Sequence, residues 1–140
     1  MNILVIDGQG GQLGSQLIRE IRAAYPQLEL TAVGTNSAAT ASMLKAGAQR
    51  GATGENAVLV GCRRADVIVG PIGMVIADSL CGEVTPKMAV AIGQAEAVRI
   101  LISLNQCENL VAGVPKLSMA RLISDAVDRL GSLCGGEVSL

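Results

Sequence analysis

Short apolar runs alternate with segments of helical periodicity along most of the chain. Residues 2–6 form an apolar, β-branched run, which is typical of a buried parallel strand. Between Leu13 and Ala24, apolar residues recur at helical spacing with polar residues between them. The same patterns predict further strands over 28–34, 48–52, 66–70, 98–104 and 110–113. They predict further helices over 38–46, 57–60, 72–80, 87–97 and 119–130.

Strands that alternate with helices over short turns predict right-handed βαβ units and a parallel sheet. The predicted fold class is therefore α/β, with a doubly wound, mostly parallel sheet in a Rossmann-like three-layer α/β/α arrangement. A flavodoxin-like strand order is the competing topology. We expect a single domain over residues 1–130, followed by a flexible C-terminal tail over 131–140 that contains Gly135 and Gly136.

The composition excludes some classes of function. Half of the 140 residues are hydrophobic and 16% are charged, but there is no Trp or Phe and only one Tyr, so aliphatic residues must fill the core. A net charge of −1 and the lack of aromatic stacking surfaces argue against nucleic-acid binding. No apolar run is long enough for a membrane span or a signal peptide, so a cytoplasmic location is expected.

Four cysteines lie far apart in the sequence, and there is no histidine. This pattern argues against a metal site and favours reduced thiols that act as small apolar core fillers. The four are Cys62, Cys81, Cys107 and Cys134.

The first strand turns into the first helix through a glycine-rich loop, Asp7-Gly8-Gln9-Gly10-Gly11-Gln12-Leu13-Gly14. Its glycines are spaced three apart, whereas the dinucleotide fingerprint G-x-G-x-x-G would place a glycine where Leu13 stands. The first N–H groups of a helix lack partners within the helix, and its dipole favours an anion there. The loop therefore suggests a phosphate-bearing ligand; a tight turn that merely packs is the alternative.

Two more loops leave strands at the same predicted edge of the sheet, where ligands bind in doubly wound folds. The candidate ligand-binding residues in the first loop are Gly8, Gln9, Gly10, Gly11, Gln12, Leu13 and Gly14. Those in the other two loops are Gly34, Thr35, Asn36 and Ser37, and Gly70, Pro71, Ile72 and Gly73. For residues 35–37, a ribose contact and a simple helix cap are both open interpretations.

The cofactor is not determined by these loops. No acidic residue follows the second strand, where an NAD site would place one for the ribose, and no Arg stands there for a 2′-phosphate. NADP or another nucleotide, held by residues 35–37 and the helix N-terminus, remains compatible. Asp7 would repel phosphate unless a cation or loop amides compensate its charge; it ties down the turn, contacts a ribose or binds magnesium.

The glycine loop resembles the start of extended short-chain dehydrogenases/reductases over about the first 35 residues. That family's catalysis needs a Tyr-x-x-x-Lys pair, but the single tyrosine, Tyr25, is followed four residues later by Glu29, so the resemblance carries over no catalysis. Nearly the whole chain resembles a family of small bacterial proteins known as a domain of unknown function. The matching stretches include 5–11, 33–37, 43–48, 51–58 and 70–86. This resemblance implies no activity, but it implies that 34–37, 51–56 and 70–86 belong to one site.

We expect a cytoplasmic Rossmann-like protein that binds a nucleotide, a dinucleotide or another phosphate-bearing molecule. One alternative is a small enzyme acting on a phosphorylated metabolite with Asp7 or Asp78 as acid or base. Another is an oligomeric scaffold or regulatory subunit without a small-molecule ligand. Residues 72–77 and 88–93 are apolar on all sides of their predicted helices, which predicts a homodimer through residues 72–97.

Overall fold

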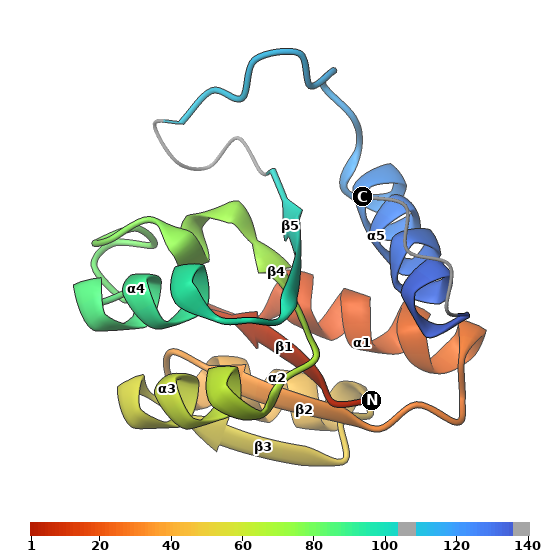
Figure 1. The fold of residues 1–140 in the computed structure, drawn as a ribbon, viewed down its shortest axis with the longest axis horizontal. Helices are drawn as coiled ribbons and strands as arrows, with labels where there is room; N and C mark the ends of the chain where they lie inside the picture. The colour runs from red at the N-terminus through yellow and green to blue at the C-terminus, as the bar shows by residue number, and fades with distance from the viewer. Residues whose placement is uncertain (104–108, 136–140) are drawn as a thin grey trace.

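One parallel sheet of five strands forms the centre of the protein (Figure 1). The structure is a computed structural model that describes residues 1–103 and 109–135. The strands are β1 (Ile3–Asp7), β2 (Leu30–Gly34), β3 (Arg50–Thr53), β4 (Val67–Pro71) and β5 (Val98–Ile102). The helices are α1 (Gln12–Ala24), α2 (Ser37–Ala46), α3 (Glu55–Arg64), α4 (Pro86–Gln94) and α5 (Met119–Cys134), with a 3-10 helix, η1 (Ile72–Val75).

The strand order, β3-β2-β1-β4-β5, decides between the two predicted topologies. All four pairings are parallel, and the chain reverses its direction of winding between β1 and β4. This is the Rossmann order rather than the flavodoxin order, and it places the crevice for ligands beyond the carboxyl ends of β1 and β4. The predicted α/β doubly wound fold is therefore confirmed.

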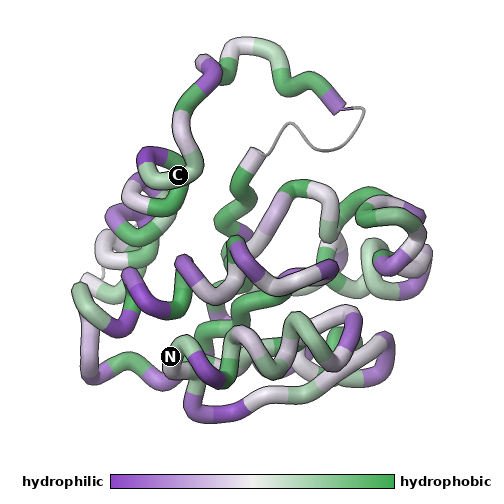
Figure 2. Tube along the Cα trace, turned by 180° about the vertical axis from the view of Figure 1, so that it is seen from behind, coloured by the Kyte–Doolittle hydropathy of each residue, from purple (hydrophilic) through white to green (hydrophobic). Residues whose placement is uncertain are grey.

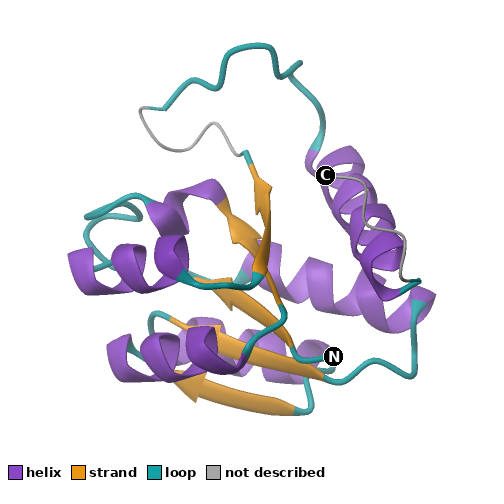
Figure 3. Ribbon diagram, viewed as in Figure 1, coloured by secondary structure: helices purple, strands orange, loops and turns teal. Residues whose placement is uncertain are grey.

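Helices cover both faces of the sheet, which gives three layers (Figure 3). On one face, α1, α2 and α5 pack against alternate strand residues such as Val5 and Val69. On the other face, α3, α4 and η1 pack against Leu4, Ile6 and Ile68. Strands that are buried on both faces explain why the sequence shows continuous apolar runs instead of alternation. None of the helices described is long and apolar enough to cross a membrane.

Two glycines allow the elements around β1 to approach closely. A Cβ on Gly14 would lie 2.9 Å from the Asp7 Cβ and would also clash with Met43 of α2. A Cβ on Gly70 would overlap the carbonyl oxygen of Ile6 in the neighbouring strand. At both positions the space for a side chain is already taken by the core.

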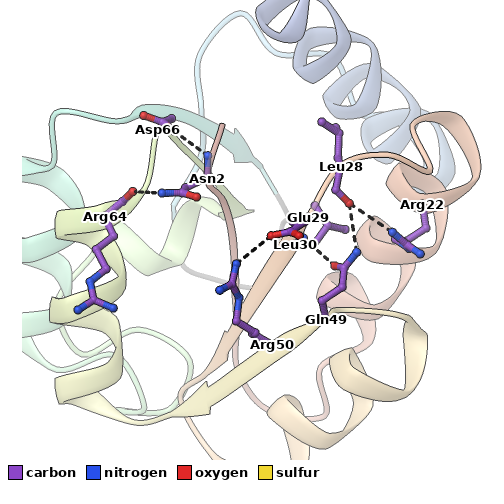
Figure 4. Close-up of polar contacts among 9 residues, drawn as sticks. All are labelled: Asn2, Arg22, Leu28, Glu29, Leu30, Gln49, Arg50, Arg64 and Asp66. Carbon is purple, nitrogen blue, oxygen red and sulfur yellow. Dashed lines mark hydrogen bonds and ion pairs between the residues drawn. The ribbon is translucent and has the colours of Figure 1, made fainter.

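Polar side chains connect the amino ends of the strands (Figure 4). The amide of Asn2 donates to the Asp66 carboxylate at 2.6 Å, which joins the start of β1 to the segment before β4. The Gln49 side chain accepts from the Leu30 amide at 2.8 Å and so joins β3 to β2. These contacts fix the register at the end of the sheet opposite the predicted ligand-binding loops.

Several predicted boundaries are wrong. Only Ile72–Val75 of the predicted helix 72–80 is helical, as a 3-10 turn, and residues 76–84 form a series of turns. The predicted strand 110–113 has no strand geometry. Helix α3 is longer than expected, and α5 continues through Gly131 to Cys134, so 131–134 do not belong to a tail. Residues 104–108 and 136–140 lie outside the described residues.

Substituting Gly70→Ala should lower the free energy of unfolding by about 1–3 kcal/mol, because the new methyl group meets backbone in β1. The matched control is Gly93→Ala on the exposed side of α4, where a Cβ meets nothing within 4 Å. There we expect a gain of about 0.5–1 kcal/mol from helix propensity. Urea denaturation of both variants checks the prediction, and equal effects at the two sites would contradict it.

Candidate functional site

The carboxylate of Asp7 closes the glycine loop at the end of β1. Its Oδ1 accepts a hydrogen bond from the Gly8 amide at 2.8 Å, and its Oδ2 accepts one from the Gly14 amide at 2.7 Å. Gly11, the N-cap of α1, has a φ of 73° and has no side chain to cap the helix, so Asp7 satisfies one of the free first-turn amides instead. Of the roles considered for Asp7, tying down the turn is the one this geometry supports.

Asp7 is a buried carboxyl group, with 7% of its surface exposed. Burial raises its pKa, the amides of Gly14 and Gly8 offset part of this rise, and the negative charge of Glu83 raises it further. The net pKa of Asp7 therefore lies above the ordinary value for an aspartate.

A second carboxylate, that of Glu83, joins the predicted ligand-binding loops to each other. One oxygen, Oε1, accepts hydrogen bonds from the Gln9 amide at 2.9 Å, the Thr35 hydroxyl at 2.7 Å and the Asn36 side-chain amide at 2.7 Å. Three donors from the loops after β1 and β2 thus converge on a single negatively charged oxygen. Such charge-assisted hydrogen bonds are the stronger ones in proteins.

These contacts determine the acidity of Glu83. Partial burial raises its pKa, but the hydrogen bonds from Thr35, Gln9 and Asn36 together lower it more, so the net pKa lies below the ordinary value. Glu83 is therefore a carboxylate at neutral pH. In the sequence, Glu83 is included only within the stretch 70–86 that the family resemblance assigns to one site.

Glu83 is positioned by the capping segment, which we define as residues 76–84. Its backbone folds back on itself, with the Asp78 amide donating to the Val84 carbonyl at 2.8 Å. Leu80 and Cys81 have positive φ values of 55° and 56°, which residues other than glycine rarely adopt. A regular helix over 72–80 would carry these residues away from the sheet edge, so tertiary contacts override the local apolar pattern here.

The missing side chain of Gly8 makes room for the capping segment. A Cβ on Gly8 would lie 2.6 Å from the Thr35 hydroxyl oxygen, 2.9 Å from Leu80 and 3.2 Å from Glu83 Oε1. A Cβ on Gly10, by contrast, would meet nothing within 4 Å. Of the loop glycines, Gly8 is thus required for the contact with Glu83, whereas Gly10 faces open space.

A group of threonines and acids brings residues 51–56 to the same edge. The Gly54 amide donates to the Gly34 carbonyl at 2.9 Å, and the hydroxyls of Thr40 and Thr53 lie 2.7 Å apart. Thr85, the N-cap of α4, donates its hydroxyl to Glu55 Oε2 at 2.6 Å. The stretches 34–37, 51–56 and 83–85 therefore lie side by side. Thr53 lies in the stretch 51–56 that the family resemblance assigned to the site, whereas the contribution of Thr40 was not predicted, because it depends on how β3 pairs with β2.

Other predicted site residues take different positions. Gly70 packs against β1, and Gly73 is buried. Asn36 caps α2 by accepting from the Ala39 amide at 2.8 Å and also donates to Glu83, so it serves both interpretations. Asp78 is exposed in a turn, not placed on a helix as expected.

Donors for a further anionic group remain at the start of α1. Within the described chain, the amides of Gly10, Gln12 and Leu13 donate to no protein acceptor. The hydroxyl of Ser15, in the first turns of α1, is buried and has no hydrogen-bond partner among the described residues. Buried polar atoms are usually paired with protein or with an ordered water, so this hydroxyl is an exception among the described residues.

The cysteines and the acidic residues form no second chemical centre in the described residues. Cys62 is buried, and burial raises its pKa to about 11, although Arg99 lowers it in part. Cys81 and Cys134 are exposed, which corrects the expectation that all four cysteines fill the core; Cys107 lies outside the described residues. The described part of the chain holds no group of three residues suited to bind a metal ion.

Fold and site together define a Rossmann-type α/β protein whose loops gather hydrogen-bond donors around an anionic oxygen. The chain belongs to the family described as Domain of unknown function (DUF3842), whose model matches residues 2–134. Among solved structures, it is similar to the dodecameric FMN-dependent UbiX-like decarboxylase from Escherichia coli O157:H7. That likeness has 17% sequence identity and a TM-score of 0.49, and it covers 94% of this chain and 76% of the other. No curated protein matches the chain.

Glu83→Gln should reduce the free energy of unfolding at pH 7 by roughly 1–2 kcal/mol, because the charge-assisted hydrogen bonds weaken. A lowered folded-state pKa gives stability that is present above the unfolded pKa, about 4.3. This stability is lost as pH falls through the folded pKa. The difference in the free energy of unfolding between wild type and variant should therefore vanish in acid. A difference that is constant from pH 3 to 7 in chemical denaturation would contradict the prediction.

Asp7→Asn should change the pH dependence of the free energy of unfolding in the sense opposite to Glu83→Gln. With its raised pKa, folded wild-type Asp7 binds a proton more strongly than the unfolded chain does, above about pH 3.9. Relative to the variant, the unfolding free energy of wild type should thus fall as pH rises from 4 through the folded pKa. Denaturation curves at half-unit pH intervals measure this slope, and a rising difference would overturn the prediction.

Proposed function

We propose that the protein binds a small phosphate-bearing molecule of the nucleotide class at the loops beyond β1 and β2, where the ligand takes the place of the Glu83 carboxylate. One observation carries the proposal. The donors of Gln9, Thr35 and Asn36 converge on one anionic oxygen. A phosphate oxygen has the same charge and the same need for donors as the carboxylate oxygen that now occupies this position.

The start of α1 supplies the remaining requirements for a phosphate. The amides of Gly10, Gln12 and Leu13 have no protein acceptor within the described residues, and the positive end of a 13-residue helix favours negative charge. The backbone at Gly10 is open to approach by a ligand. In this proposal the buried hydroxyl of Ser15 gains a partner directly or through an ordered water.

Glu83 acts as an internal competitor in this proposal. A dianionic phosphate and the Glu83 carboxylate cannot share the same three donors, because like charges at contact distance repel. Binding therefore requires the capping segment to withdraw Glu83. The apparent affinity of wild type is reduced by the fraction of molecules in which the carboxylate has withdrawn.

The test compares Glu83→Gln with wild type in ligand binding. Thermal shift and calorimetry would use inorganic phosphate, adenine nucleotides, NAD, NADP, flavin nucleotides and coenzyme A as probes. We expect at least one phosphate-bearing probe to bind the variant tenfold or more tightly, because the competing charge is gone. Saturation at 100 times the dissociation constant should add about 2.7 kcal/mol of stability.

The control variant is Glu29→Gln, which removes a carboxylate from an exposed ion pair with Arg50 at the other end of the sheet. It should bind as wild type does. Two results would overturn the proposal: no response to any probe at millimolar concentration in both wild type and Glu83→Gln, or weaker binding in Glu83→Gln.

A further inference from the structure

The connection from β5 to α5 contains an exposed apolar segment, residues 109–118, which we call the arm. Every residue of the arm is exposed, and Figure 2 shows its hydrophobic positions along a loop that extends away from the sheet. Leu110 is 93% exposed. Between two described residues of the arm, the only backbone hydrogen bond runs from the Val114 amide to the Val111 carbonyl. Fixing such a segment costs conformational entropy, which its own contacts do not offset.

The arm borders a groove of about 790 Å³ between β5 and α5. The strand supplies one wall through residues 98–103. Helix α5 supplies the other through the apolar residues Leu122, Ala126 and Leu133 and the polar residues Asp125, Arg129 and Ser132. Val111, Val114 and Leu117 of the arm line the same groove. The groove therefore combines apolar and polar side chains, and the arm adds exposed apolar residues beside it.

The two edges of the sheet differ in their protection against pairing. At the β3 edge, Arg50 forms an ion pair with Glu29 at 3.0 Å. At the β5 edge, the only charged strand residue is Arg99. Its guanidinium turns back to donate to carbonyls at the end of α4, including that of Ala95 at 2.6 Å. Leu101 is 37% exposed beside it. The β5 edge therefore lacks the charges that normally block edge-to-edge association.

Exposed large hydrophobic residues are concentrated in β5 and the arm. Eight are exposed in the described chain, and five of them lie between residues 101 and 117: Leu101, Leu110, Val111, Val114 and Leu117. Within 72–97, where the sequence predicted the interface, only Val90 belongs to this group, because α4 buries Met88 and Ile92. The premise of apolar helices exposed on all sides is thus corrected, and the apolar surface lies elsewhere.

We propose that a second copy of the chain docks here, with the β5 edges pairing antiparallel across a two-fold axis and each arm covering the partner's groove. Antiparallel pairing of two identical edges is self-complementary, as a two-fold interface requires. The strand, the arm and the exposed side of α5 provide about 20 residues, which matches the number on each side of a stable interface. The proposal does not depend on ligand binding, because the donors around Glu83 come from other segments.

Sedimentation velocity from 1 to 100 µM tests the proposal with two variants of exposed residues. The sedimenting species of wild type should have twice the chain mass of 14.3 kDa, or the mass of a larger even-numbered assembly. Leu110→Lys with Val114→Lys should weaken association at least 100-fold, because two charges enter an apolar interface. The control Val90→Lys, on exposed α4, should associate as wild type does. Circular dichroism establishes that each variant is folded.

Hydrogen exchange adds a readout of the paired strand. Amides of residues 98–102 and 109–117 should become more protected as the wild-type concentration rises, and not in the Leu110→Lys, Val114→Lys variant. A monomer at 100 µM would overturn the proposal and would favour cover by residues 136–140 or by a different protein. Dissociation by Val90→Lys alone would overturn it in favour of residues 72–97.

Discussion

Two backbone amides that donate to one buried carboxylate set the geometry at the centre of this protein. Asp7 accepts hydrogen bonds from the Gly8 and Gly14 amides at 2.8 and 2.7 Å, so one side chain connects the end of β1, the glycine loop and the first turn of α1. The loop can then present the Gln9 amide to Glu83 in a fixed direction. Without this contact, the N-cap position at Gly11 would leave the start of α1 with no side-chain acceptor.

The negative charge at this helix start belongs to the protein itself. Asp7 accepts hydrogen bonds from the Gly8 and Gly14 amides, and Glu83 accepts one from the Gln9 amide of the same loop. Burial, and then the charge of Glu83, raise the pKa of Asp7, while hydrogen bonds lower the pKa of Glu83 and keep it ionised. In the proposed function, this arrangement is an anion site with Glu83 as its internal occupant, and its donors are arranged before any ligand arrives. Preorganised donors lower the cost of binding, whereas the occupant raises it.

The two halves of the sheet differ in the residues at their loops and edges. The half formed by β1, β2 and β3 carries the polar loops, and its outer edge is short and ion-paired. The half formed by β4 and β5 ends in an apolar edge beside the arm. A doubly wound sheet allows this separation, because the loops beyond its strands and its outer edge strand lie on different parts of the surface.

The sequence by itself determined the alternation of strands and helices, because strands buried on both faces must be apolar and surface helices must be amphipathic. It also located the loops at 8–14 and 34–37, because glycines at a strand-to-helix turn and polar caps are local signals. The helix predicted over 72–80 was wrong for a tertiary reason. The capping segment gains contacts to Gly8 and Thr35 that a helix would forgo.

Only the tertiary structure decided the strand order, the role of Glu83 and the exposed face. Strand order depends on which edge each crossover joins, and no local pattern encodes that choice. Glu83 lies 74 residues from Gln9 in sequence, so only the folded chain brings the carboxylate to that amide. Likewise, the apolar residues of α4 become core or surface according to which side of the helix meets the sheet. Local residue patterns determined the elements, and long-range packing determined which of their side chains meet.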